Sequence, residues 1–145
     1  MVREFGKRVS GITSLKRLIY LISPSKIKKD FYPTLDKVLA HKNVEFFQLR
    51  LKNTKTQTIL RITKRIKRIT DKYKVKLIIN DKINLALKTK VAGCHMGQLD
   101  GSLAISRKKL KNKILGITCH NSKKLAKNAI KNNADYIAFG SFHKS

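Results

Sequence analysis

The sequence predicts an α/β fold built on a largely parallel sheet. Short apolar runs rich in β-branched residues recur along the chain, and a stretch with helical periodicity follows each run except the last. The runs are continuously apolar rather than alternating, which is typical of strands buried on both faces. Periodicity alone leaves two architectures open, a doubly wound open sheet and a barrel of strands ringed by helices.

Six strands are expected, each bounded by polar or glycine-containing segments that predict turns. The predicted strands cover residues 17–23, 45–52, 75–80, 92–97, 114–119 and 136–140. No linker or change of composition divides this series. We therefore expect one domain, residues 15–145, behind a basic N-terminal extension, residues 1–14.

The clearest helix lies between the second and third strands. Its apolar residues recur at spacings of three and four, with basic residues between them, so one face is expected to be buried. A basic amphipathic helix can also lie on a membrane or in a nucleic-acid groove, but its place in a strand–helix series favours packing on the sheet. The apolar residues are Ile59, Ile62, Ile66, Ile69 and Tyr73, and the other predicted helices cover residues 32–40, 82–89, 103–110 and 122–132.

The chain is strongly basic, with 34 Lys and Arg against 8 Asp and Glu and a net charge of +26 over 145 residues. Such a charge attracts polyanions. Lys, Ile and Asn together account for 51 residues, however, which an AT-rich coding sequence produces whatever the protein does. The chain has no Trp, no paired Cys and His at finger spacing and no aromatic residues interleaved with the basic ones, so we do not expect nucleic acid as its partner.

The apolar runs are too short for a membrane protein. The longest continuous run, residues 18–22, falls below the roughly 20 residues of a membrane span and the roughly 7–15 residues of a signal-peptide core. The two cysteines, Cys94 and Cys119, do not make a disulfide framework and are expected to be free thiols. We expect a cytoplasmic protein that does not associate with membranes.

Polar residues cluster where the predicted strands end, which is where both candidate architectures place their chemistry. Asp81 follows the third strand and Asp100 the fourth. Two carboxylates there suit Mg²⁺, which prefers oxygen ligands and shares its shell with water and substrate phosphates. Arg50 and Lys52, two residues apart on the second strand, are expected to project to one side and to bind phosphate oxygens. With the Asn80 amide, these groups describe a diphosphate site.

Each candidate also has a purely structural explanation. Asp81 could cap the following helix, Asp100 could belong to a turn, and Arg50 and Lys52 could be solvated charges. Their joint placement at strand ends favours the functional interpretation.

Two Cys-His pairs raise the alternative of a zinc site, because Cys and His are the usual zinc ligands. The pairs are Cys94-His95 and Cys119-His120. Adjacent residues on a strand point to opposite faces, so neither pair is expected to bind one ion from one side. Buried thiols are the favoured interpretation.

Six segments, in register along the chain, resemble the thiamine-phosphate synthase family. They are residues 18–24 (LIYLISP), 48–52 (QLRLK), 79–81 (IND), 95–100 (HMGQLD), 115–120 (LGITCH) and 134–140 (ADYIAFG). The resemblance implies a (β/α)8 TIM-barrel fold, here incomplete, with about six strands and five helices. Thiazole tautomerases share the fold, but the intact IND and GQLD segments favour the synthase branch.

The resemblance also implies a reaction and a set of site residues. The family joins a hydroxymethylpyrimidine diphosphate to a thiazole phosphate and releases pyrophosphate. The leaving diphosphate needs its charge neutralised more than the reaction needs a base. The implied residues are Arg50, Lys52 and Thr118 as catalytic, Gln48, Arg50, Lys52, Asn80, Thr118 and Ser145 as substrate-binding, and Asp81 and Asp100 as ligands of Mg²⁺.

The family pattern continues beyond residue 145 through two more strand–helix units, whose loops commonly bind phosphate. We therefore expect the thiazole phosphate site to be absent, and the first and sixth strands to be unpaired and open to self-association. Two other functions compete with an active synthase. One is a basic nucleic-acid-binding module on the same scaffold, and the other is a non-catalytic remnant or subunit that pairs its open edges with another chain.

Overall fold

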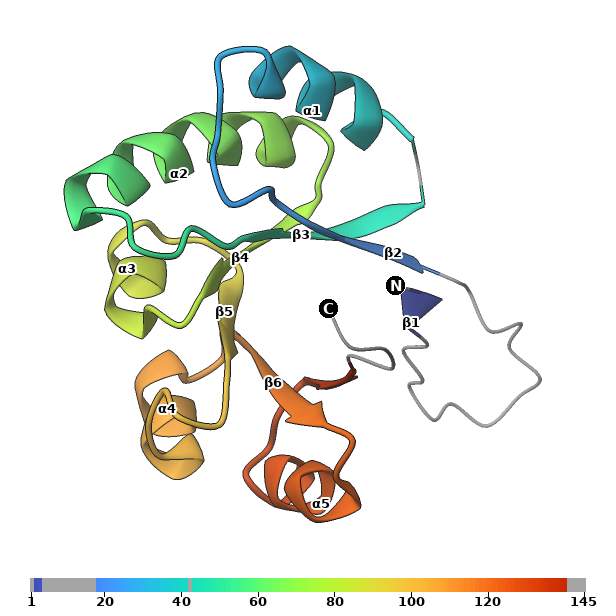
Figure 1. Ribbon diagram of the computed structural model, residues 1–145, viewed down its shortest axis with the longest axis vertical. Helices are drawn as coiled ribbons and strands as arrows, with labels where there is room; N and C mark the ends of the chain where they lie inside the picture. The colour runs from blue at the N-terminus through green and yellow to red at the C-terminus, as the bar shows by residue number, and fades with distance from the viewer. Residues whose placement is uncertain (1, 4–17, 42, 141–145) are drawn as a thin grey trace. The chain divides into compact units, whose positions relative to one another are not determined.

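The computed structural model describes residues 2–3, 18–41 and 43–140, in which strands and helices alternate (Figure 1). The chain forms two compact units, Met1–Leu77 and Ile78–Ser145, here called unit 1 and unit 2. Within the described residues, six strands and five helices follow one another as predicted, and one further short strand precedes them. The predicted alternation is therefore confirmed.

Unit 1 is built on parallel pairing of its two longer strands. β2 pairs with β3 in a register that sets Ile22 opposite Gln48. The short strand β1 pairs antiparallel with β2, so the expectation that the first strand would be unpaired is wrong over two residues. The elements are β1 (Val2–Arg3), β2 (Leu18–Ile22), α1 (Phe31–Leu39), β3 (Val44–Leu49), α2 (Thr56–Lys72) and the start of β4 (Lys76–Asn80).

The amphipathic helix α2 is confirmed as a packed helix. Ile59 and Ile66 are buried, and Thr63 and Thr70 lie on the same buried face, while Ile62 and its neighbours at the margin are partly exposed. α2 packs against α1. Its cations face outward, and three of them bind residues of the same unit: Arg65 lies over the Tyr32 ring, Lys67 pairs with Asp71 and Lys72 pairs with Asp36.

Unit 2 repeats the strand–helix pattern with every strand parallel to the next. Its sheet order follows the chain order from β4 to β7. The elements after β4 are α3 (Ile83–Lys88), β5 (Gly93–Met96), α4 (Leu103–Leu110), β6 (Ile114–His120), α5 (Lys123–Lys131) and β7 (Tyr136–Phe139). Ile78, Cys94, Leu115 and Ile117 are fully buried, which explains why these strands are continuously apolar.

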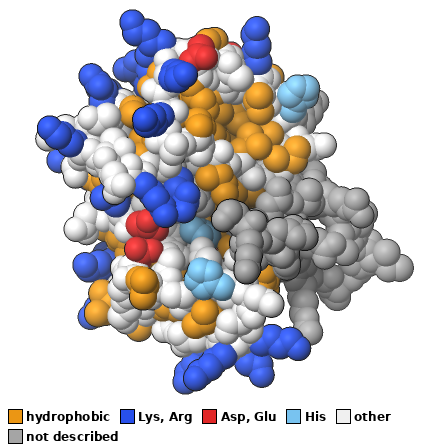
Figure 2. Space-filling view, in the orientation of Figure 1, with side chains coloured by type: hydrophobic (Ala, Val, Ile, Leu, Met, Phe, Trp, Pro, Cys, Tyr) orange, Lys and Arg blue, Asp and Glu red, His pale blue; other side chains and the backbone are white. Residues whose placement is uncertain are grey.

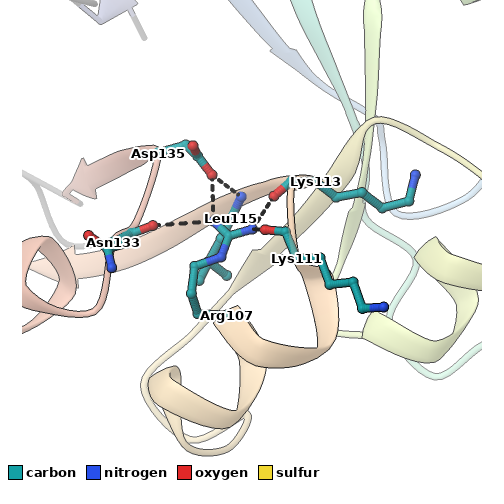
Figure 3. A network of polar contacts seen from close by, with 6 residues as sticks. All are labelled: Arg107, Lys111, Lys113, Leu115, Asn133 and Asp135. Atoms are coloured by element: carbon teal, nitrogen blue, oxygen red, sulfur yellow. Dashed lines mark hydrogen bonds and ion pairs between the residues drawn. The ribbon is translucent and has the colours of Figure 1, made fainter.

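An arginine ties the end of α4 to the strands of unit 2 (Figure 3). Figure 3 shows the Arg107 guanidinium donating to the carbonyls of Lys111 and Lys113 and to the Asp135 carboxylate. The bond from Arg107 to Asp135 is 2.8 Å long. The same carboxylate accepts the backbone N–H of Leu115 at 2.8 Å. These charge-assisted bonds satisfy carbonyls just past the helix end, where Lys111 has a positive φ of 51°.

Most predicted boundaries differ from the structure by one or two residues, but the second strand is shorter than predicted. β3 ends at Leu49 rather than at residue 52. Beyond it, the Arg50 N–H donates to the Ser23 hydroxyl at 3.0 Å instead of continuing the strand pairing, and Asn53 has a positive φ of 50°. A side-chain acceptor and a left-handed residue thus turn the chain out of the sheet.

Candidate functional site

The cationic candidates of unit 1 lie in the loop directly after β3. Arg50 and Lys52 are both exposed, and the residue between them, Leu51, is buried. The segment is a loop and not part of the strand, so the predicted projection of both side chains to one side stays a prediction. Among the residues that the structure describes, neither cation has a hydrogen bond or ion pair from its charged group. Both charges are open to an anionic ligand.

Gln48, predicted to bind substrate, is a buried polar residue at the end of β3. Its side chain is 3% exposed, and its Nε2 donates to the Tyr20 hydroxyl at 3.0 Å. Tyr20 lies on β2, directly beside β3, and stacks on the Phe46 ring with centroids 5.4 Å apart. The stacked ring fixes the hydroxyl, which in turn fixes the Gln48 amide.

Asn80 and Asp81 lie at the carboxyl end of β4, in unit 2. Asp81 has a positive φ of 61°, and its N–H donates to the His95 carbonyl at 2.8 Å. The capping alternative is wrong, because the residue at the start of α3 is Lys82 and no side chain caps that end. Asp is one of the residues that tolerates left-handed backbone, so the turn holds the carboxylate at the strand end without a capping role.

Asp100 lies in the loop between β5 and α4. Its Oδ2 accepts the Gly97 N–H at 2.6 Å, and Gly101 follows with a φ of 120°. The turn that was the structural alternative is therefore present. This bond uses one carboxylate oxygen, and the side chain is exposed, so a ligand can still approach Asp100.

The negative charges of Asp81 and Asp100 both affect the pKa of one buried thiol, that of Cys94. Burial, together with the negative charges of Asp81 and Asp100, raises the pKa of Cys94 from 9.0 to about 12. Both charges must therefore lie near one side chain of β5. The described residues contain no group of three or more His, Cys, Asp and Glu side chains that could hold a metal ion. Carboxylate oxygens are ligands that Mg²⁺ prefers, and this ion keeps water and phosphate in the rest of its shell.

Thr118 lies on β6 in a network that joins three strands of unit 2. Its hydroxyl is 2.8 Å from His95 Nε2, and His95 Nδ1 is 2.9 Å from the Tyr136 hydroxyl. Gln98 Nε2 also donates to the Thr118 carbonyl. His95 is 6% exposed, whereas Thr118 is partly exposed. The network therefore holds a buried imidazole behind a hydroxyl that a ligand can reach.

One predicted site residue lies outside the described part of the chain, and three residues of the site were not predicted. Ser145 lies outside the described residues, so its role stays a prediction. Tyr20, His95 and Tyr136 were not among the predicted site residues. Tyr20 bonds to Gln48 and His95 contacts Thr118, which were predicted, and Tyr136 contacts His95. The sequence held one sign of the contact with Tyr136. Gly116 is a glycine inside an apolar strand, and such glycines often mark the close approach of a neighbouring group.

The Cys-His pairs do not gather into a zinc site among the described residues. Cys94 and Cys119 are both buried, and both ring nitrogens of His95 contact hydroxyl groups. His120 is exposed at a positive φ of 47°, on the turn that ends β6. This arrangement gives no position where Cys and His side chains converge on one ion.

The basic side chains and the helices are the features on which the polyanion and membrane alternatives depended. On the face drawn in Figure 2, Lys and Arg side chains are spread over the surface rather than gathered in one patch. None of the helices in the described part of the chain is long and apolar enough to cross a membrane.

Comparisons with known proteins agree on one family. The family model described as thiamine monophosphate synthase matches residues 19–145. A protein from Pelagibacter ubique named thiamine-phosphate synthase is 54% identical over 129 residues, which are 88% of this chain and 62% of the relative. One of the same name from Erythrobacter litoralis is 35% identical, over 92% of this chain and 64% of the relative. The chain thus spans a little under two thirds of these relatives.

A solved structure agrees with the fold. The thiamine phosphate pyrophosphorylase from Pyrococcus furiosus matches with a TM-score of 0.77 and 25% sequence identity, over 87% of this chain and 61% of that one. The predicted fold class, strand–helix units of the (β/α)8-barrel type, is confirmed by this likeness.

Proposed function

The chain belongs to the thiamine monophosphate synthase family, and from this membership we propose that it acts in thiamine biosynthesis as a thiamine-phosphate synthase. The reaction joins a hydroxymethylpyrimidine diphosphate to a thiazole phosphate and releases pyrophosphate. The observation that carries the proposal is the 54% identity to a protein of that name over 88% of the chain.

Arg50 and Lys52 are proposed to neutralise the diphosphate as it leaves. Their charged groups are exposed and have no partner among the described residues, which supports this role, because a leaving diphosphate gathers negative charge that cations stabilise. The bond between the pyrimidine methylene carbon and the diphosphate oxygen breaks first, leaving a carbocation. The thiazole nitrogen then donates its electron pair to that carbon, and the diphosphate that left in the first step is released as pyrophosphate.

Asp81 and Asp100 are proposed to hold Mg²⁺. The negative charges of both carboxylates raise the pKa of Cys94, which supports this assignment. Bound there, Mg²⁺ would supply Lewis-acid stabilisation of diphosphate oxygens. Asn80, at the end of β4, is proposed to bind the same diphosphate through its amide.

Gln48 and Thr118 are proposed to bind the pyrimidine, and Ser145 the substrate. Gln48 and Thr118 are polar residues held by a neighbouring aromatic or imidazole ring, in unit 1 and unit 2 respectively. Polar side chains whose orientation is fixed suit the recognition of a flat heterocycle, because its few polar atoms point in fixed directions.

The test is pyrophosphate release by the purified chain given both substrates, with and without Mg²⁺. Asp81→Asn and Asp100→Asn are each expected to lower the rate at least about 100-fold. Asp71→Asn is the matched control, since it removes an exposed carboxylate that only pairs with Lys67 on α2. A folded chain that releases no pyrophosphate, or Asp81→Asn with unchanged activity, would contradict the proposal.

We also propose that the protein is cytoplasmic and self-associates through its sheet edges. Two buried cysteine thiols are compatible with a reducing compartment. Ile130 on α5 and Phe139 on β7 are apolar and exposed, which favours association. Size-exclusion chromatography with light scattering is expected to show oligomers, and a monodisperse monomer would contradict the expectation.

A further inference from the structure

Three residues lie side by side across neighbouring strands of unit 2. The strand register sets His95 of β5 opposite Gly116 of β6, and Gly116 opposite Tyr136 of β7. The middle residue has no side chain, and the His95 and Tyr136 rings therefore meet across it, stacked with centroids 5.5 Å apart and planes 23° apart. A Cβ on Gly116 would lie 1.9 Å from Cζ of Tyr136. Glycine at this position is what permits the contact.

The stacked rings form the middle of a chain of hydrogen bonds. The Tyr136 hydroxyl lies 2.9 Å from His95 Nδ1, and Thr118 Oγ1 lies 2.8 Å from His95 Nε2. Thr118 is two residues after Gly116 on β6, so both face the same side of the sheet. A neutral imidazole has one donor nitrogen and one acceptor nitrogen, so one hydroxyl must donate to the ring and the other must accept from it.

The chemistry of the two hydroxyls favours one of these two directions. A phenol is a stronger hydrogen-bond donor than an aliphatic alcohol, because its oxygen is more acidic. A Tyr136 hydroxyl that donates to Nδ1 places the ring proton on Nε2. Nε2–H then donates to the Thr118 oxygen, and the Thr118 proton is left to point away from His95.

We propose that Tyr136 is a positioning residue that acts through His95 to fix Thr118 as a hydrogen-bond donor. The partly exposed Thr118 hydroxyl would then bind an acceptor on the ligand, such as a ring nitrogen of a pyrimidine. The identity of that ligand rests on the proposed function, whereas the direction of the hydrogen bonds does not. The bond from Gln98 to the Thr118 carbonyl holds the backbone of the same residue.

The direction of the bonds can be measured by NMR on the chain labelled with ¹⁵N in its four histidines. Long-range ¹H–¹⁵N correlations distinguish a ring protonated on Nε2 from one protonated on Nδ1, and His95→Gln identifies the signals of His95. We expect the wild-type His95 proton on Nε2 alone. A proton on Nδ1, or on both nitrogens at neutral pH, would overturn the inference.

Tyr136→Phe tests the positioning role, because phenylalanine keeps the stacked ring and removes the donor. His95 is expected to become a mixture of both tautomers, a change that a merely structural role would not produce. Tyr32→Phe is the control, since it removes a phenol hydroxyl in unit 1, from a ring that lies under Arg65. An unchanged tautomer in Tyr136→Phe would contradict the role, and the wild-type spectrum decides the bond direction even if the variant does not fold.

The consequence for substrate is measured separately. Tyr136→Phe is expected to raise the KM for the pyrimidine diphosphate about three- to tenfold, the effect of one misdirected hydrogen bond, with a smaller change in kcat. An unchanged KM alongside a changed tautomer would overturn the link to the ligand. Absence of pyrophosphate release from the wild-type chain would count against the proposed function alone, because the tautomer measurement needs no substrate.

Discussion

In unit 1 the cationic candidates Arg50 and Lys52 extend from a loop with no partner for their charged groups among the described residues, whereas in unit 2 Thr118 is held by His95 and Gln98. The difference matches the forces involved. Attraction between a cation and a diphosphate does not depend on direction and is retained as the side chain moves. A hydrogen bond to a heterocycle weakens steeply with angle, so its donor must be held in place.

The largest expected effect concerns the part of unit 2 that holds its strands together. Arg107→Ala should lower the free energy of unfolding by about 2–3 kcal/mol, because it leaves carbonyls and the Asp135 carboxylate without their charged donor. Urea unfolding followed by circular dichroism measures this. Arg68→Ala is the matched control, an exposed arginine of α2 for which we expect a change within about 0.5 kcal/mol. Equal effects of the two variants would show that unit 2 is not stabilised by the Arg107 network.

A smaller effect on stability is expected from the Cys94 thiol, whose pKa is raised by burial and by the charges of Asp81 and Asp100. The pKa of Cys94 is raised to about 12 in the folded protein, mainly by burial. Because the folded-state pKa lies above the unfolded one, the contribution of the thiol to stability is present below about pH 9 and is lost as the pH rises toward 12. Between pH 8 and 10 the wild type should lose about 1 kcal/mol more than Cys94→Ser, whose hydroxyl does not ionise.

Urea titrations of the wild type and Cys94→Ser at both pH values provide the measurement. If both proteins lost the same free energy of unfolding between these pH values, the pKa of Cys94 would not be raised in the folded protein. Thiol alkylation at pH 8 gives an independent check, since both cysteines should react only after unfolding.

The smallest effect on stability is expected in unit 1. Arg50→Met and Lys52→Met should each change the free energy of unfolding by less than about 0.5 kcal/mol, because neither charged group binds a described part of the chain. The same variants should weaken binding of inorganic pyrophosphate about tenfold, measured by calorimetry. A variant that destabilises the protein without weakening binding would reverse the contrast between the two units.

Much of the fold was predictable because it follows from local patterns. Continuously apolar, β-branched runs specify strands buried on both faces, and the structure places a strand in each of them. The helix predicted over residues 103–110 is α4 with the same bounds. The stripe of Ile59 and Ile66 predicted which face of α2 is buried. Six short segments also carried the family resemblance, since each lies at a strand end where chemistry is placed.

Other features were decided by contacts between residues distant in the sequence. The end of β3 depends on a hydroxyl of Ser23, 27 residues earlier. The left-handed turn that displays Asp81 depends on the carbonyl of His95 in the next strand. These bonds form only when the strands pair, so no local pattern along the chain predicts them.

The partnership of His95 with Tyr136 shows the same division most clearly. The sequence contains the histidine, the glycine and the tyrosine, and it predicts that each lies on a strand. Only the pairing of β5, β6 and β7 sets them in one row, because a shift of one residue in register would turn each side chain to the opposite face of the sheet. Composition and periodicity thus determined the elements, and the strand register decided which side chains meet.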